Sequence, residues 1–191
     1  MRISRLALFA LVSFTWLALS ISPATVSAQT LEEQYDATLA AYNSTLNQLE
    51  ECDEGFAAFQ QFFKEQRPAA GASKEEWDNW GRAYRTWVEV YTRCMNKLKK
   101  EADNLRRKLD ELEKQLSSLA DTTRPPRKED DDRKKKARDL LNKGKGDLDQ
   151  WTLNVRYKIQ KVNDWSKEAS DQVGEHGSVA VRIEPRFVFK F

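Results

Sequence analysis

Apolar side chains recur at helical spacing over two long stretches of the chain. Residues three and four positions apart share one face of an α-helix, so this recurrence predicts amphipathic helices. Counted in heptads, the first stretch has apolar residues at Tyr35, Tyr42, Leu49, Phe56 and Phe63, flanked by Leu39, Leu46, Cys52 and Phe59. The second has Trp77, Tyr84, Tyr91, Leu98, Leu105, Leu112 and Leu119, flanked by Trp80, Trp87, Cys94, Ala102, Leu109 and Leu116. Both stretches are predicted to be long helices.

Each predicted helix has a start signal at its first residues. A hydroxyl side chain stands three residues before a glutamate, in Thr30 with Glu33 and in Ser73 with Glu76. In such a capping box the two side chains satisfy each other's free backbone amides. Residues 67–72 contain one proline and one glycine and predict the turn between the helices. The two helices should therefore form an antiparallel hairpin.

A pair of cysteines, Cys52 and Cys94, occupies matching positions on the two predicted helices. If they face each other, antiparallel residues at equal height have numbers that sum to 146, which places Leu31 opposite Gln115 and makes the helix ends coincide. A disulfide closing this loop would stabilise the hairpin by about 4 kcal/mol in the chain-entropy model. The alternative is a reactive or intermolecular thiol pair, but the chain has no Cys-x-x-Cys motif and no histidine near either cysteine.

A third helical segment follows a break at Pro125 and Pro126, which cannot continue a helix. It begins with the acidic residues 129–132, each four positions before a basic residue in 133–136. These pairs predict a solvated helix face rather than a calcium or phosphate site. Gly144 and Gly146 predict a bend or short break. Apolar residues recur at Leu141, Leu148, Val155 and Val162, beside Trp151, Ile159 and Trp165.

The C-terminal residues alternate between apolar and polar side chains, which predicts a two-faced β-strand. Its apolar face, the predicted partner-docking surface, comprises Val179, Val181, Ile183, Phe187, Phe189 and Phe191. A single strand must pair with something, so we expect it to fold back about Pro185 or to add to a partner or another copy. The expected fold is therefore mainly α, an elongated, coiled-coil-like antiparallel hairpin or three-helix bundle, with a short C-terminal β-strand or hairpin.

The first 28 residues have the pattern of an export signal. Arg2 and Arg5 precede an apolar run from Leu6 to Ile21, and small residues end the segment at Ala28. Cleavage there would leave 163 of the 191 residues and reduce 32 basic against 30 acidic residues to 30 against 30. A neutral chain without a basic stripe is a poor nucleic-acid binder. The expected location is extracytoplasmic, in a bacterial periplasm or secreted, where a disulfide can form.

These signals divide the chain into five parts. We expect a signal peptide at 1–28, a disulfide-braced hairpin at 29–120, a proline-containing linker at 121–128, a third helical segment at 129–173 and a β tail at 174–191.

Two resemblances add to this description. The ending, with Phe191 terminal and aromatic residues at every second position before it, resembles the C-terminal signal of bacterial outer-membrane barrel proteins. That likeness implies outer-membrane association. The combination of export signal, helical arms and terminal strand is similar to the architecture of Skp-type periplasmic chaperones, which implies holdase activity. That family opens with a strand and has basic arms, whereas this chain enters a helix at Thr30 and is neutral.

Candidate chemistry elsewhere is sparse. An aromatic band of Trp77, Trp80, Tyr84 and Trp87 could hold an unfolded client, although its spacing favours packing in the core. The single histidine, His176, stands without cysteines or clustered acids, so we expect no metal and no cofactor. Our leading hypothesis is an exported non-enzymatic spacer or adaptor that docks through its terminal strand to a protein partner or to itself. The alternatives are a periplasmic holdase and an outer-membrane component inserted through that strand.

Overall fold

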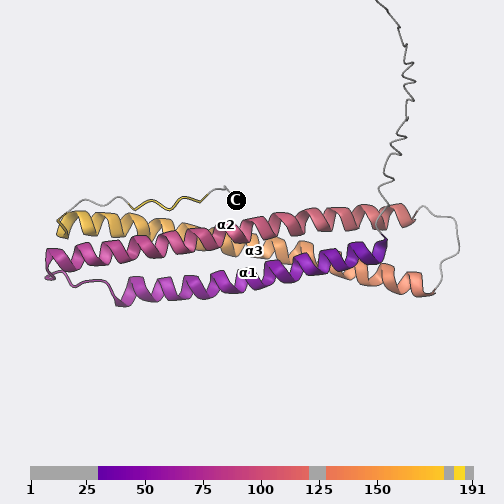
Figure 1. Ribbon diagram of the computed structural model, residues 1–191, viewed down its shortest axis with the longest axis horizontal. Helices are drawn as coiled ribbons and strands as arrows, with labels where there is room; N and C mark the ends of the chain where they lie inside the picture. Colours follow the sequence, from indigo (N-terminus) through magenta and orange to yellow (C-terminus); the bar gives the residue numbers. More distant parts are fainter. Residues whose placement is uncertain (1–29, 121–127, 179–182, 188–191) are drawn as a thin grey trace, which may run out of the picture.

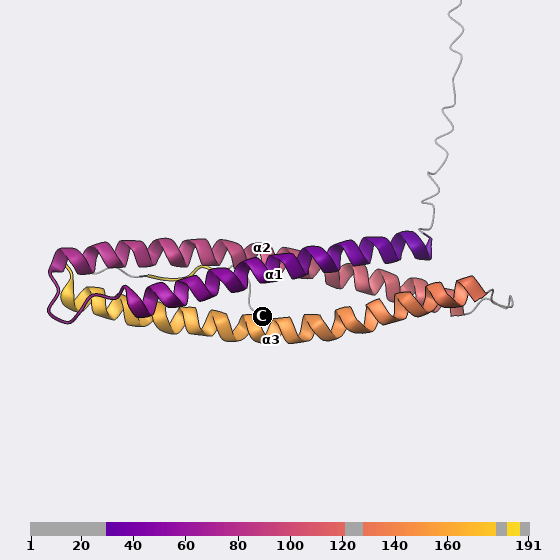
Figure 2. The ribbon, with the colours of Figure 1, turned by 90° about the horizontal axis from the view of Figure 1, so that it is seen from below.

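The computed structural model describes residues 30–120, 128–178 and 183–187. Three long helices, α1 (Leu31–Glu65), α2 (Lys74–Ala120) and α3 (Lys128–His176), lie side by side as a narrow rod. Helix α2 packs on both α1 and α3, and α1 also contacts α3 (Figures 1 and 2). The helical part of the expected fold is thus confirmed as a three-helix bundle. The predicted signal peptide and most of the linker lie outside the described residues.

Helices α1 and α2 form the predicted antiparallel hairpin. The Thr38 hydroxyl donates to the Lys108 carbonyl at 3.3 Å near one end, and Cys52 is bonded to Cys94 at mid-length. Towards the turn the rings of Phe59 and Trp87 stack with centroids 6.0 Å apart. The residue numbers of all three pairs add to the same value. The predicted register therefore holds along the length of the hairpin.

Both capping boxes form. The backbone amide of Thr30 donates to Glu33, and the amide of Glu33 donates back to the Thr30 hydroxyl at 3.2 Å. Ser73 and Glu76 make the same reciprocal pair, with the Ser73 amide 2.7 Å from the Glu76 carboxylate. These bonds satisfy amides that have no partner inside the helix, and they begin α1 and α2 at residues that the sequence indicates.

The apolar stripe counted on α1 packs against α3 as well as against α2. The Tyr42 hydroxyl donates to Asp147 at 2.6 Å, and the rings of Phe56 and Phe63 stack on Trp165 with centroids 5.5 and 5.3 Å apart. Since Tyr42 meets Asp147, whereas Phe56 and Phe63 further along α1 meet Trp165 further along α3, helices α1 and α3 run parallel. This orientation was not predictable from the sequence.

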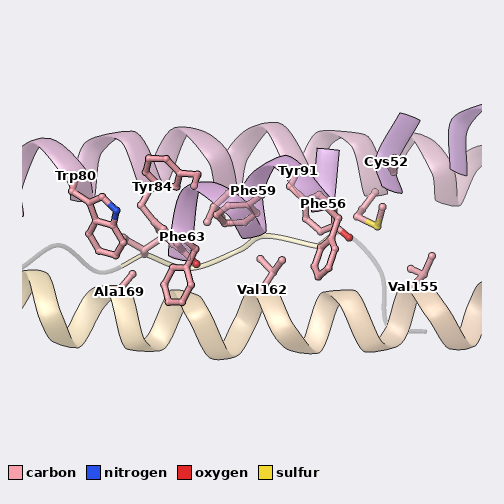
Figure 3. Packing of buried hydrophobic residues seen from close by; sticks show 14 of the residues in the cluster. Cys52, Phe56, Phe59, Phe63, Trp80, Tyr84, Tyr91, Val155, Val162 and Ala169 are labelled. Atoms are coloured by element: carbon pink, nitrogen blue, oxygen red, sulfur yellow. The ribbon is translucent and has the colours of Figure 1, made fainter. Parts of the chain in front are cut away.

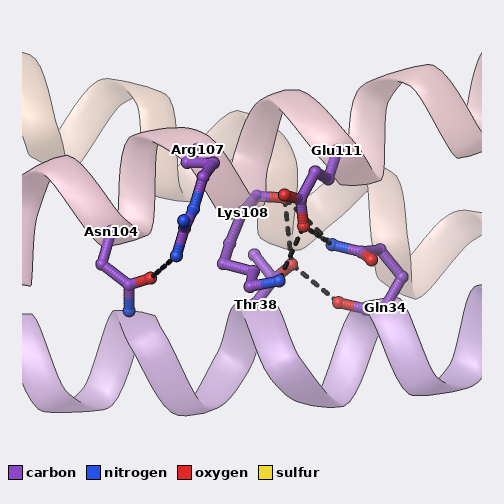
Figure 4. Close-up of polar contacts among 6 residues, drawn as sticks. All are labelled: Gln34, Thr38, Asn104, Arg107, Lys108 and Glu111. Carbon is purple, nitrogen blue, oxygen red and sulfur yellow. Dashed lines mark hydrogen bonds and ion pairs between the residues drawn. The ribbon is translucent and has the colours of Figure 1, made fainter.

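A second stripe of α1, mostly polar or small, packs against α2. We call it the polar seam, and its members are all buried: Gln34, Thr38, Ala41, Thr45, Gln48 and Cys52. The Thr38 and Thr45 hydroxyls donate to carbonyls four residues earlier, at 2.7 and 2.8 Å. The Gln34 amide donates to Glu111 at 3.2 Å (Figure 4). Each buried polar group therefore has a partner, which removes the penalty of burying it.

The half of the rod nearer the α1–α2 turn has an aromatic core. Side chains of Phe59 and Tyr84 are fully buried, with ring centroids 5.2 Å apart. Figure 3 shows them facing Val162 and Ala169 of α3. Fully burying a large apolar side chain stabilises a fold by about 1.5–3 kcal/mol, so this layer is a main source of the stability of the rod.

Helix α3 continues without interruption through Gly144 and Gly146, so the predicted break there was wrong. A Cβ atom at Gly144 would lie 2.8 Å from Cδ2 of Leu109, whereas one at Gly146 would meet nothing within 4 Å. Gly144 lets α3 approach α2 closely. The contact with Leu109 offsets the low helix propensity of this glycine, and tertiary packing keeps the segment helical.

Candidate functional site

The disulfide joins the two arms of the hairpin and is unequally accessible on its two sides. The Cα atoms of Cys52 and Cys94 are 5.7 Å apart. Cys52 is fully buried, whereas Cys94 is only half-buried. The side-chain amide of Gln48, itself buried in the polar seam, donates to both sulfurs, at 3.4 Å to Cys52 and 3.3 Å to Cys94. Cys94 thus reaches the surface while Cys52 does not, and both sulfurs accept a hydrogen bond.

An open groove of about 450 Å³ lies between α1 and α2 beside this bond. Cys94 and Tyr91 line it, and so does Val90, a side chain 48% exposed. Gly55 contributes from α1, and a Cβ atom there would meet nothing within 4 Å. We call this hollow the disulfide groove.

Charged side chains also line the disulfide groove. Arg93 and Lys97, on either side of Cys94 in α2, face Glu51 of α1 across the opening. The Lys97 ammonium is 3.6 Å from the Glu51 carboxylate, and both side chains are exposed. With two cationic side chains and one anionic side chain, the lining of the groove has a net positive charge.

The aromatic band is part of the core. Trp77, Trp80 and Tyr84 are buried, and Trp87 is half-buried. Trp80 stacks on Phe62, with ring centroids 6.2 Å apart. An unfolded client would reach the three buried rings only if the packed helices separated.

The C-terminal residues come back along the outside of the bundle. The backbone amide of Ile183 donates to the Ser170 hydroxyl of α3 at 3.0 Å, and the side chain of Ile183 is 4% exposed. Ile183 shares an open groove of about 580 Å³ with Val88 and Thr92 of α2. Phe187 is half-buried against the same core. We call the place where Ile183 is held the tail seat.

The turn that returns the chain to the tail seat is specific to its sequence. The Gly177 amide donates to the Val173 carbonyl at 2.9 Å, and the Ser178 amide donates to the Asp78 carboxylate at 3.0 Å. A Cβ atom at Gly177 would lie 2.5 Å from that carboxylate and 2.6 Å from the Val173 carbonyl. Only glycine fits without displacing one of them, so Gly177 and Asp78 together direct the tail back over the bundle.

The described part of the tail forms no strand. Residues 183–187 are extended without pairing in a sheet, and within this range Ile183 alone is fully buried. The other predicted docking residues, Val179, Val181, Phe189 and Phe191, lie outside the described residues. Of the predicted docking surface, the structure therefore places Ile183 and Phe187, and it places them on the bundle of the same chain.

No group of three or more metal-ligating side chains occurs in the described ranges. The imidazole of His176 packs on Trp77, with ring centroids 5.0 Å apart. The acidic start of α3 is exposed, and Arg133 of the basic run lies 3.7 Å from Glu32 of α1. Of the three helices described, none is both long enough and apolar enough to cross a bilayer.

Comparison with known protein families, curated proteins and solved structures finds no match to this chain. Any function proposed for it must be argued from its own residues.

Sequence reasoning missed the residues that hold the tail. Ser170 and Asp78 are isolated polar residues on helix faces, and nothing in their spacing marks them as partners of a distant backbone amide. Gly177 carries a usable signal, because a glycine just past the last periodic apolar residue is typical of a helix C-terminus. Gln48 was missed because a polar residue was not counted in the apolar stripe.

Proposed function

We propose that this chain is an exported, non-enzymatic helical spacer or adaptor, and that its C-terminal segment 178–191 is the docking element. The observation that carries the proposal is the way this segment is held. Within residues 183–187 one side chain, that of Ile183, is fully buried, while Glu184 and Arg186 are exposed. A segment that lies on the outside of the bundle with charged side chains exposed is a good candidate for exchange between its own bundle and a partner.

The shape and bracing of the bundle support a spacer role. Helix α3 has 49 residues, which at 1.5 Å per residue is roughly 70 Å. The disulfide ties α1 to α2 at mid-length, and ion pairs of Lys158 with Asp53 and of Arg67 with Glu168 link α3 to α1 and to the turn. A braced rod of this kind holds its two ends at a fixed separation.

The docked form of the segment would be a β-strand. Its apolar and polar residues alternate along the sequence, which suits addition to the edge of a sheet in a protein partner or pairing with the same segment of a second copy. The export signal predicted from the sequence supports a docking event outside the cytoplasm, in a periplasm or in the extracellular space.

Light scattering of the mature protein with and without residues 178–191 tests the docking role. If the segment docks to a second copy, the full-length protein has the mass of a defined oligomer. The truncated protein is then a monomer with the same helical circular dichroism signal. Equal masses for the two forms would exclude self-docking, and a loss of helicity on truncation would show that the segment instead completes the fold.

A further inference from the structure

We propose that the Cys52–Cys94 bond is a redox site, at which a dithiol reductant attacks the sulfur of Cys94 from the disulfide groove. This site is separate from the tail seat and does not depend on the docking role. The inference rests on the unequal burial of the two cysteines, on the open groove lined by Cys94 and on a hydrogen-bond donor placed against both sulfurs.

Accessibility decides which sulfur is attacked. Cys52 has no exposed surface, whereas Cys94 lines the disulfide groove. Thiol–disulfide exchange requires an attacking thiolate to approach one sulfur of the bond, and its rate depends on access to that sulfur. The attack therefore occurs at Cys94, and Cys52 is the leaving group.

The charges lining the groove favour the attacking species. A thiolate is an anion, and Arg93 and Lys97 bring two cations to the opening against the single carboxylate of Glu51. Opposite charge at the mouth of a site raises the local concentration of an incoming anion. The exposed Val90 beside them offers an apolar contact for the surface that carries the thiolate.

Gln48 stabilises the group that leaves. As the bond to Cys94 breaks, the electron pair goes to the sulfur of Cys52, which becomes a buried thiolate. The Gln48 amide already donates to that sulfur at 3.4 Å. Hydrogen bonding to a charged form favours it, so the buried thiolate has a donor in place before it forms.

The electrons and protons of the exchange balance. The first thiolate of the reductant forms a mixed disulfide with Cys94 and releases Cys52, which takes a proton. The second thiol of the reductant attacks the reductant's own sulfur in that mixed disulfide and releases Cys94. The reductant is oxidised by two electrons to its disulfide, and the protein is reduced by two electrons to a dithiol. The reduced hairpin keeps its packing but loses the covalent link between α1 and α2.

Two glycines give a matched pair of variants. Gly55 lines the groove, whereas Gly146 is an exposed residue of α3, and a Cβ atom at either position meets nothing within 4 Å. Gly55→Gln places an uncharged side chain in the groove above Cys94, and Gly146→Gln makes the same substitution elsewhere. Both variants gain helix propensity, so both should fold.

The experiment measures reduction of the folded protein by dithiothreitol, followed by alkylation and mass spectrometry. We expect Gly55→Gln to be reduced about tenfold more slowly than the unmodified protein and Gly146→Gln at the unmodified rate. With mercaptoethanol as the probe, the trapped mixed disulfide should be on Cys94. Equal rates for the two variants, or a mixed disulfide on Cys52, would overturn the proposal. A rate that rises steeply in urea below the unfolding transition would also overturn it, because reduction would then require unfolding.

Discussion

Tyr84 and Tyr91 lie two turns apart in the aromatic core, and their hydroxyls have different surroundings. The hydroxyl of Tyr84 is 3.3 Å from the Ser166 hydroxyl of α3. Among the described residues, the hydroxyl of Tyr91 is buried without a hydrogen-bond partner. A buried polar group without a partner costs free energy that a paired one does not. The core therefore contains one tyrosine that phenylalanine would replace without loss.

Phenylalanine substitutions should separate these two residues. We expect Tyr84→Phe to lower the free energy of unfolding by about 1 kcal/mol, because it leaves Ser166 without its partner. Tyr91→Phe should leave that free energy unchanged or raise it by up to about 1 kcal/mol. Urea denaturation followed by circular dichroism measures both. A larger loss for Tyr91→Phe than for Tyr84→Phe would show that the Tyr91 hydroxyl has a stabilising partner.

The same residues predict how stability depends on alkaline pH. Burial raises the pKa of the Tyr84 and Tyr91 phenols above the ordinary value of 10.0. Above pH 10 the unfolded chain ionises these phenols while the folded protein holds them neutral, so the free energy of unfolding falls as pH rises. Removing one phenol in Tyr91→Phe should make this fall shallower. An identical slope in the variant and the unmodified protein would contradict the prediction.

At the scale of single elements, Gly144 and Gly146 of α3 differ in the atoms that an added Cβ would contact. Gly146 is open, so Gly146→Ala should raise the free energy of unfolding by about 0.5–1 kcal/mol through helix propensity. Gly144→Ala should not, because its methyl group meets Leu109, a side chain only 1% exposed that has no free space to move into. Thermal and urea unfolding of the two variants compares them directly. Equal stabilisation would mean that α2 and α3 are less closely packed than described.

The start of α2 predicts a dependence on acid pH. Hydrogen bonds from the hydroxyl and backbone amide of Ser73 hold the pKa of the Glu76 carboxyl below its ordinary value of 4.5. The capping box therefore contributes fully above that value, and its contribution is lost as pH falls through the lower pKa of the folded protein. Glu76→Gln keeps the side-chain oxygen but cannot titrate, so its unfolding midpoint should change less between pH 5 and pH 3. A midpoint that falls as steeply as in the unmodified protein would contradict this.

Helix positions and the hairpin register were predictable because capping boxes, heptads and cysteine spacing are local patterns that agree with one another. The sequence did not predict which stripe of α1 contacts α2 and which contacts α3. Heptad counting selects the most apolar stripe, and that stripe packs against α3 as well as against α2. Counting apolar residues in heptads did not detect the polar seam, because the members that contact α2, such as Gln34 and Thr38, are polar. Their hydroxyl and amide groups donate hydrogen bonds within α1 or to α2. The bonds to α2 depend on how the helices pack in three dimensions.

At the scale of the whole molecule, the tail shows where alternation of apolar and polar residues fails as a guide. Alternation predicts that a segment has two faces, but a strand also needs an edge to pair with. Residues 183–187 instead place Ile183 against the bundle through Ser170, while the chain turns at Gly177. The rod and the tail are thus held differently: the rod by its core and disulfide, and the described part of the tail by the turn at Gly177, the burial of Ile183 and the packing of Phe187 on the core.

Photo-crosslinking is the most direct way to test whether the tail dissociates from the tail seat and docks to another chain. A photoreactive phenylalanine derivative would replace Phe187 of the tail and, as the control, Tyr157 of α3, an aromatic residue 61% exposed on the same molecule. If the tail docks to another chain, irradiation of cells that naturally make the protein links position 187, but not position 157, to a second polypeptide chain. If position 187 links only to α2 or α3 of its own chain, the tail is a strap of the bundle and the docking role is wrong.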